Sequence, residues 1–206
     1  MANLILILIL VTVVCSIAAF SSKETMSKMI FNPYMVFHHR EWWRFFTGGF
    51  IHADWIHLLV NMLVLYAFGE STLNYYRYFF HERGEYYFLI LYFGGMLVAS
   101  ATTYKKHRDN FEYNSLGASG AISAVVFAAI LFQPMAQLCL YGILCLPGIV
   151  MGALYVAYSY FAAKRPGQYI NHDAHLWGAI FGSAFTLVMK PDLFNIFIDS
   201  FSDLLK

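Results

Sequence analysis

Long, uncharged apolar runs constrain this chain more than any other feature of its sequence. Residues 4–20 contain no charged side chain, and comparable runs recur as far as residue 189. Only 12% of the 206 residues are charged and 60% are hydrophobic, whereas a soluble domain is usually about a quarter charged. An apolar stretch of about 20 residues can cross a bilayer as a helix. We therefore expect an all-α, polytopic membrane protein.

The apolar runs predict six transmembrane helices in one domain of residues 1–206. Their expected ranges are 4–20, 55–73, 86–104, 117–132, 138–161 and 174–189. A signal peptide is the alternative for the first run, but no basic side chain precedes it. Pro147 and Gly148 predict a kink within the fifth helix. The residues after Pro191 predict an interfacial or frayed tail.

Residues 21–54 predict a long first loop in the membrane interface, because they combine charged side chains with many aromatic ones. Within this loop we interpret Arg44 as a residue that holds the loop together, not as a ligand for a substrate. His52 has two open interpretations, a structural hydrogen-bonding residue or a functional one.

Composition argues against several other kinds of site. The net charge of +1 offers no basic surface for nucleic acid. The cysteines lie within apolar runs, so we interpret them as buried small hydrophobic residues, without a disulfide framework. Two polar clusters could suggest a metal, but neither gives three ligands at a tight metal spacing, so we expect no metal and no cofactor. The residues concerned are Cys15, Cys139 and Cys145 for the cysteines, and His38, His39, Glu41, His172, Asp173 and His175 for the clusters.

Ser119 lies where a Gly- and Ser-rich turn meets an apolar helix, in the segment NSLGASGAISAVVFAAILF of residues 114–132. Gly117 and Gly120 stand close on either side of it. Backbone N–H groups are unpaired at the start of a helix, so a nucleophile and an oxyanion hole can be built there together. The motif alone is weak, because small residues in a membrane helix usually indicate close packing. The nucleophile elbow of α/β-hydrolases is not matched, since residue 121 is Ala.

His175 begins the last apolar helix and is followed by Gly178 and Gly182 on the same face. This Gly-x-x-x-Gly spacing lets two helices approach closely, and the fourth helix offers a matching face of small residues that begins at Gly120. Pressing the two faces together brings Ser119 near His175, which can accept and return the hydroxyl proton. No acid is well placed as a third member, so the sequence predicts a Ser–His dyad.

The two helices that carry the dyad are short. Residues 119–132 span about 21 Å at a rise of ~1.5 Å per residue, whereas the hydrocarbon core is roughly 30 Å thick. Irregular backbone at membrane depth is tolerated where it is buried or lines a water-filled cavity. The sequence therefore predicts a pocket that water can enter.

His57 and Asn61 are four residues apart on the second helix and share one face. Both are costly in lipid, so we expect them to face the interior of the bundle. Each can donate a hydrogen bond. Together with the backbone N–H of Ser119 they predict an oxyanion hole.

These motifs occur in a fixed order along most of the chain: Trp43-Arg44, His52, the HxxxN of His57 and Asn61, GASG around Ser119, and Ala174-His175 followed by Gly178 and Gly182. In that order the chain resembles the rhomboid intramembrane serine proteases of the six-helix bacterial type. The resemblance implies that Ser119 is the nucleophile and His175 the general base. It implies that His57, Asn61 and the Ser119 backbone form the oxyanion hole, with Arg44, His52, Gly117, Gly120, Gly178 and Gly182 as structural support. It also implies a first loop that lies sideways in the membrane and a fifth helix that gates substrate entry with its neighbouring loop.

Two positions depart from the family pattern. Many rhomboids place an aromatic residue one turn after the serine, stacked on the catalytic histidine, and here that position is Ser123. What orients His175 is therefore open. A Glu often follows the glycine that ends the second helix, and here Gly69 is followed by Glu70 and then by Asn74, which leaves the tethering of that helix open.

The expected partners are the lipid bilayer and membrane-protein substrates with helix-destabilised transmembrane segments. A regular transmembrane helix shields its carbonyls, so cleavage requires local unwinding, which Gly or Pro favours. A small residue is expected before the cut bond. Two other functions stay open, a non-catalytic rhomboid-like binding factor and a small transporter. Intramembrane His and Asn suit a transporter, but no inverted repeat is evident.

Two signals disagree about orientation in the membrane. With a cytoplasmic N-terminus, the loops on the outer side carry nine Lys and Arg residues and the inner side carries four, against the positive-inside rule. The resemblance implies a cytoplasmic N-terminus and an active site that opens to the outer side of a bacterial inner membrane. We follow the resemblance because a membrane-embedded first loop is not an ordinary short loop.

Overall fold

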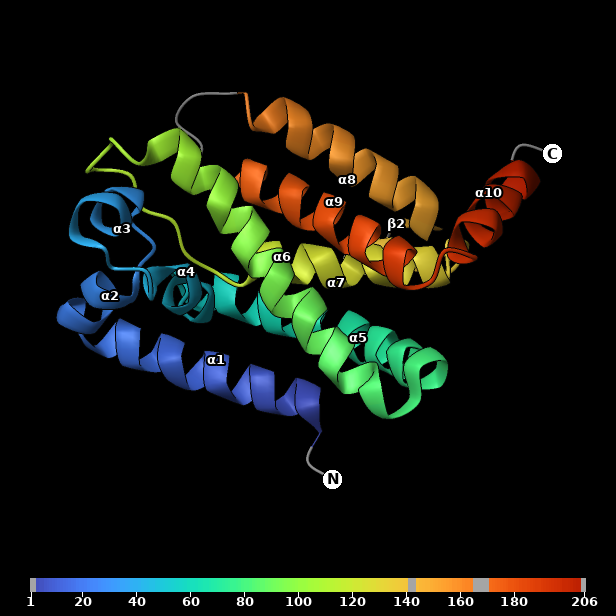
Figure 1. The fold of residues 1–206 in the computed structure, drawn as a ribbon, viewed down its shortest axis with the longest axis horizontal. Coiled ribbons are helices and arrows are strands. Elements are labelled where there is room, and N and C mark those ends of the chain that lie inside the picture. The colour runs from blue at the N-terminus through green and yellow to red at the C-terminus, as the bar shows by residue number, and fades with distance from the viewer. Residues whose placement is uncertain (1–2, 141–143, 165–170, 205–206) are drawn as a thin grey trace.

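The computed structural model describes residues 3–140, 144–164 and 171–204 as a bundle of helices with one small hairpin (Figure 1). Figure 1 places α1 and α8 at opposite edges of this bundle. The elements in chain order are α1 (Leu4–Ser21), α2 (Lys23–Met29), α3 (Pro33–His39), α4 (Arg44–Thr47), η1 (Gly48–Phe50), α5 (Trp55–Phe80), η2 (His81–Arg83), α6 (Gly84–His107), α7 (Ser119–Phe132), β1 (Gln137–Leu140), β2 (Leu144–Pro147), α8 (Gly148–Ala162), α9 (His172–Met189) and α10 (Leu193–Leu204).

The helix α7 forms the centre of the core. It packs against α5, α6 and α9, and Ala124, Val125 and Ala128 on it are fully buried. A helix that is apolar on all sides belongs in an interior, and α7 carries no charged residue. The catalytic candidate Ser119 therefore begins the most enclosed helix of the bundle.

Side chains at several helix starts accept backbone N–H groups and so fix where each helix begins. Asn3 caps α1, Asp54 caps α5 by accepting from the N–H of His57 at 2.8 Å, and Asn171 caps α9 by accepting from Ala174 at 3.0 Å. Asp54 and Asn171 thereby set the first turns that carry His57 and His175.

The first loop, expected over residues 21–54, is not irregular along its whole length. It folds into the short elements α2, α3, α4 and η1. Asn32 starts α3 by accepting from the Met35 N–H at 2.9 Å, with Pro33 at the first helical position. These turns make the loop a compact layer beside α1 and α6.

The prediction of a fifth helix over residues 138–161 is wrong in its first part. Gln137–Leu140 and Leu144–Pro147 form an antiparallel hairpin, with Gln137 opposite Pro147, and α8 begins only at Gly148. A short apolar run can form a strand as well as a helix. Pro147 also disfavours a helical conformation at the residue before it. Pro147 and Gly148 therefore mark the start of a helix and not a kink within one, and the fold is not purely α-helical.

The interpretation of the cysteines as buried residues without a disulfide is wrong for Cys139 and Cys145. Cys139 and Cys145 stand opposite each other in the hairpin, are exposed, and form a disulfide. Their pairing follows from the hairpin register, which the expectation of a helix excluded. Cys15 remains a free thiol on α1.

The second helix, expected to end at residue 73, continues as α5 to Phe80. Leu73 and Tyr76 in that stretch are fully buried, so packing extends the helix past the exposed Asn74. The chain reverses at η2, where His81 has φ of 52° and where a Cβ on Gly84 would lie 2.6 Å from Arg77 backbone atoms. The helix α6 then starts at Gly84 and ends at His107, longer than the expected 86–104.

Two helical stretches in the described residues are long and apolar enough to cross a membrane, judged by length and composition. They are Leu4–Ser21 and the joined stretch Trp55–His107, which folds back on itself as α5 and α6 (Figure 1). The apolar helices Ser119–Phe132 and Gly148–Ala162 are shorter. The expectation of six transmembrane helices stays a prediction.

Candidate active site

Gly117 shapes the turn that presents Ser119. Its φ of +108° is a backbone conformation that side-chain-bearing residues rarely adopt. A Cβ at this position would lie 2.8 Å from Cε1 and 3.0 Å from Nε2 of His57. The Gly117 N–H donates to the carbonyl of Gly48 at 2.9 Å. The loop before the serine is therefore fixed between α5 and the first loop, and it passes directly over His57.

Ser119 is the first residue of α7 and is half-buried. Ala118 precedes it as the N-cap, is fully buried, and offers no side chain to accept the first N–H groups of the helix. These N–H groups lack an intrahelical partner and point toward the end of the helix. The serine hydroxyl thus lies beside backbone donors that can bind an anion.

Glycines on α9 let it touch the backbone of α7. A Cβ at Gly178 would lie 2.1 Å from the carbonyl oxygen of Gly120, and one at Gly182 would lie 2.2 Å from that of Ala124. A Cβ at Gly120 would in turn lie 2.5 Å from the Ala99 Cβ on α6. Contacts this close leave no room for any side chain, so the small residues expected to face one another do so.

His175 stands in the first turn of α9, one turn before Gly178, and is half-buried. Because Gly178 lies against Gly120, the first turns of α7 and α9 are neighbours, and Ser119 and His175 belong to those turns. Within the described residues no direct hydrogen bond joins the two side chains. Catalytic hydrogen bonds are often long in the absence of substrate and tighten when it binds.

An aromatic ring from α8 lies against the imidazole of His175. The rings of Tyr155 and His175 are stacked, with centroids 6.1 Å apart and planes inclined by 15°. The Tyr155 hydroxyl is 2.9 Å from Oγ of Ser123. Sequence reasoning missed Tyr155, because it is one of 15 tyrosines and only the position of α8 against α9 distinguishes it.

His57 and Asn61 lie on one face of α5 beneath the Gly117 turn. The Asn61 side chain is buried, and its Nδ2 has no hydrogen-bond partner among the described residues. This nitrogen lies 3.9 Å from the position that a Cβ on Gly117 would occupy. Buried donors are almost always paired, so an unpaired amide beside the Gly117 turn indicates a place for an acceptor.

His52 is fully buried and packs edge-on against His57, with ring centroids 4.9 Å apart. Its Nδ1 is 3.0 Å from Oγ of Ser16 on α1, and the Ser16 hydroxyl is also 3.2 Å from the Phe50 carbonyl. The geometry therefore gives His52 a role in joining α1 to the segment before α5 and in limiting where the His57 ring can lie.

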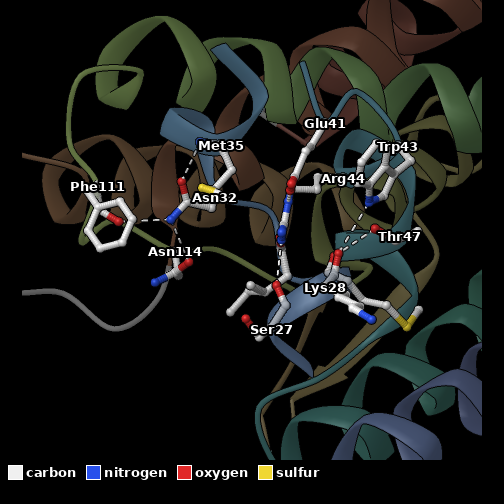
Figure 2. Close-up of polar contacts among 12 residues, drawn as sticks. Ser27, Lys28, Asn32, Met35, Glu41, Trp43, Arg44, Thr47, Phe111 and Asn114 are labelled. Atoms are coloured by element: carbon white, nitrogen blue, oxygen red, sulfur yellow. Dashed lines mark hydrogen bonds and ion pairs between the residues drawn. The ribbon is translucent and has the colours of Figure 1, made fainter. Parts of the chain in front are cut away.

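Arg44 holds the first loop together from inside (Figure 2). The side chain is 5% exposed, and its Nη1 donates to the carbonyls of Ser27 at 2.7 Å and Ile30 at 2.6 Å. Its Nε donates to the carboxylate of Glu41 at 2.5 Å. Figure 2 also shows the Trp43 indole directed at the carbonyl of Lys28, at 3.4 Å. Every one of these contacts lies within the loop, away from Ser119.

The first loop is in turn joined to the segment that leads to Ser119. Phe31 and Ser115 form an antiparallel bridge, with N–O distances of 3.0 and 2.9 Å. The Asn32 amide donates to the Phe111 carbonyl at 2.9 Å and to Oδ1 of Asn114 at 3.1 Å (Figure 2). Backbone pairing thus holds the approach to the serine against the first loop.

Asn171, a further residue that sequence reasoning missed, connects the start of α9 to the same segment. Its Nδ2 donates to Oγ1 of Thr103 at 2.8 Å and to Oγ of Ser115 at 3.2 Å, while its Oδ1 caps α9. A cap residue before a helix is the signal that could have identified it.

The carboxylates that are close in sequence to His57 and His175 have other partners. Asp173 accepts from Nζ of Lys106 at 2.6 Å, and Asp54 caps α5. In the described part of the chain no carboxylate contacts His175. In the same part, no cluster of three or more His, Cys, Asp and Glu side chains has the arrangement of a metal site.

The position after Gly69, left open by the sequence, has a partner in the structure. Glu70 accepts a hydrogen bond from the side-chain amide of Asn3 at the start of α1. A Cβ at Gly69 would lie 3.1 Å from Cδ1 of Ile5, so α1 and α5 approach closely here. Glu70 therefore tethers α5 to the first helix.

The structure is thus a helical bundle with a serine at one helix start and a histidine at the neighbouring one. The chain belongs to the rhomboid family, since the Rhomboid domain matches residues 39–191, more than half of the chain. Rhomboid family proteins are integral membrane proteins, in agreement with the apolar runs.

Curated relatives support this assignment. The chain is 34% identical over 141 residues to the presenilin-associated rhomboid-like protein A, mitochondrial, of Danio rerio, covering 66% of this chain and 34% of the relative. It is 30% identical over 148 residues to the mitochondrial RHOMBOID-like protein 12 of Arabidopsis thaliana, covering 65% and 42%. It is 33% identical over 95 residues to YdcA, a candidate rhomboid protease of Bacillus subtilis, covering 45% and 42%. The matched stretch spans less than half of the length of each of these relatives.

Proposed function

We propose that this protein is an intramembrane serine endopeptidase that hydrolyses peptide bonds in or near transmembrane segments of membrane proteins. The observation that carries the proposal is the backbone contact of Gly178 with Gly120, which makes neighbours of the helix turns that hold His175 and Ser119. A hydroxyl and an imidazole on adjacent buried helix starts, beside free backbone donors, suit acyl transfer better than binding alone.

In the proposed reaction His175 takes the proton of the Ser119 hydroxyl as Oγ attacks the substrate carbonyl. The C–O bond that forms converts the carbonyl into a tetrahedral oxyanion. His175 then gives the proton to the departing amine as the C–N bond breaks, leaving an acyl-serine. A water molecule deprotonated by His175 attacks this ester, and the proton returns to Ser119 as the carboxylate leaves.

The proposed oxyanion hole consists of the Ser119 backbone N–H, the Asn61 amide and His57. The unpaired, buried Nδ2 of Asn61 supports it, because a donor held without a partner is ready to bind developing charge without reorganisation. His57 supplies a donor from its ring, which His52 and the Gly117 turn confine from two sides.

We propose that α1, α5, α6, α7, α8 and α9 each cross the bilayer, as in the six-helix bacterial rhomboids that the sequence resembles. The short length of α7 supports this arrangement for a protease, since its 14 residues span only about 21 Å of a core of roughly 30 Å. Ser119 would then begin below one membrane surface, where water could reach the acyl-serine through the polar loops.

The proposed substrates are membrane proteins whose transmembrane segments unwind readily. A substrate helix closes its own backbone hydrogen bonds, so a scissile carbonyl reaches Ser119 only after local unwinding. We propose cleavage near the end of a single-span helix, favoured by Gly or Pro and by a small residue before the bond. The proposed location is a bacterial inner membrane with the active site opening to the outer side, and a map of tag accessibility tests it.

The experiment is incubation of the purified protein in detergent with a generic single-span substrate, together with labelling by a fluorophosphonate probe. Cleavage and labelling of the wild type, both lost in Ser119→Ala, support a serine protease. A folded wild-type protein that neither cleaves nor reacts would leave a non-catalytic binding factor or a transporter instead.

A further inference from the structure

We propose that Tyr155 is the positioning residue for the general base, and that it makes the orientation of His175 depend on the place of α8. This inference rests on the proposed function, since it concerns how the same dyad is held. Position 123, one turn after Ser119, has no aromatic ring, and Tyr155 takes over the orientation of the imidazole.

The first observation is that His175 has few other means of orientation. The nearest carboxylate in sequence, Asp173, is paired with Lys106, and the imidazole has no hydrogen bond to a side chain in the described residues. The Tyr155 ring lies nearly parallel to it at 6.1 Å, and His172 meets it edge-on at 5.9 Å. Offset parallel rings at 4.5–7 Å, roughly, attract one another, so Tyr155 restricts the rotation of the imidazole.

The second observation is that Tyr155 is itself fixed. Its hydroxyl forms a 2.9 Å hydrogen bond with Ser123, which is 5% exposed and lies one turn after Ser119 on the same helix. The Phe127 ring on α7 packs against the Tyr155 ring at 5.8 Å. Ser123, which stands where an aromatic residue was expected, therefore holds the aromatic ring of Tyr155 from α8.

The third observation concerns the attachment of α8. At its start, the N–H groups of Gly148 and Ile149 donate to the carbonyls of Ala136 and Pro134, at 2.9 and 2.8 Å. Further along, within the described ranges, the hydrogen bond of Tyr155 with Ser123 is the one that links an α8 side chain to another helix. A movement of the far part of α8 would break that bond and withdraw the ring from His175.

The geometry thus connects substrate entry with the positioning of the general base. The resemblance implies that the fifth helix gates substrate entry, and Tyr155 places a support of the general base on that helix. An enzyme with α8 displaced would hold a less ordered imidazole, and a misplacement of ~1 Å can lower a rate by about a hundredfold. Full activity would return only when α8 lies again against α7 and α9.

The test measures kcat and KM for a single-span substrate in detergent, with the melting temperature of each variant. Tyr155→Leu removes the ring, Tyr155→Phe keeps the ring and loses the hydroxyl, and Ser123→Ala removes the partner of that hydroxyl. Tyr160→Leu is the matched control, because Tyr160 lies on α8 with its side chain 47% exposed.

We expect Tyr155→Leu to lower kcat by about tenfold to a hundredfold with KM changed less than about twofold, because binding groups are intact and only the base is misplaced. Tyr155→Phe and Ser123→Ala should each lower kcat by a smaller factor than Tyr155→Leu, and the two factors should be similar. The double variant Ser123→Ala/Tyr155→Phe should lose no more than the larger single loss, since both remove one hydrogen bond. Tyr160→Leu should match the wild type.

Wild-type kcat in Tyr155→Leu would overturn the inference, and so would multiplied losses in the double variant. A loss of kcat in Tyr155→Leu that Tyr155→Phe does not partly restore would also overturn it. Any of these results with an active wild type leaves the proposed function standing. An inactive wild type whose Ser119 does not react with the fluorophosphonate probe would instead remove the proposed function itself.

Discussion

Gly178 lies so close to Gly120 that a Cβ on the first would stand 2.1 Å from the carbonyl oxygen of the second. The backbones of α7 and α9 are therefore in direct contact close to Ser119 and His175, near the start of each helix. No adjustment of a flexible side chain can relieve a clash with a carbonyl oxygen, so the distance between the two helices is set by the absence of side chains.

We expect Gly178→Val and Gly182→Val to lower turnover by about a hundredfold or more, because a separation of ~1 Å between the helices misplaces the dyad. Melting curves and an activity assay on the same samples check this. Ile180→Val, on the exposed face of α9, is the control and should keep both values. Unchanged turnover and melting in the glycine variants would contradict the contact.

Ser119→Ala and His175→Ala should each abolish cleavage while the protein stays folded. Each change removes a few atoms at a half-buried position and leaves the glycine contacts intact. Cleavage of a single-span substrate and the melting temperature are the measurements, with Ser21→Ala, at an exposed serine of α1, as the hydroxyl control. Turnover at the wild-type rate in Ser119→Ala would show that the nucleophile is another group.

Asn61→Ala should lower turnover more gently, by about tenfold to a thousandfold, the range for the loss of one donor to an oxyanion. KM should change little, because the donor acts on charge that develops only in the transition state. Asn74→Ala, an exposed asparagine on the same helix, is the matched control. If turnover stays normal when both His57 and Asn61 are replaced, these side chains do not form an oxyanion hole.

Arg44→Ala should destabilise the first loop, by about 2 kcal/mol for hydrogen bonds to a buried charged group, and should lower activity only through the loss of folded protein. Chemical denaturation and limited proteolysis within residues 21–54 measure the effect. Lys23→Ala in the same loop, an exposed residue, should change neither. A fall in kcat with unchanged stability would give Arg44 a direct role in the site.

The parts of the fold that the sequence predicts well are those fixed by local chemistry. The helix α7 begins at Ser119 and ends at Phe132, where the glycine turn and Pro134 delimit an apolar run. The small-residue spacing on α9 and α7 predicts their contact, because no other residues allow such an approach.

The remaining parts of the fold depend on tertiary contacts, which the local sequence pattern does not reveal. An apolar run before Pro147 suits a strand as well as a helix, and only pairing with Gln137–Leu140 decides between them. The contact of Tyr155 with His175 depends on how α8 lies against α9. Asn74 is polar and exposed, yet α5 continues past it because Leu73 and Tyr76 on the buried face pack into the core.

The bridge between Phe31 and Ser115 has a consequence for when the site can form. Residues near the beginning of the chain must already be folded to receive the segment that ends at Gly117, which also bonds to Gly48. During synthesis the amino-terminal part emerges first and can fold ahead of the rest. The segment that receives the serine turn is thus synthesised before the serine itself, and Ser119 takes its place at the start of α7 only once the first loop has folded.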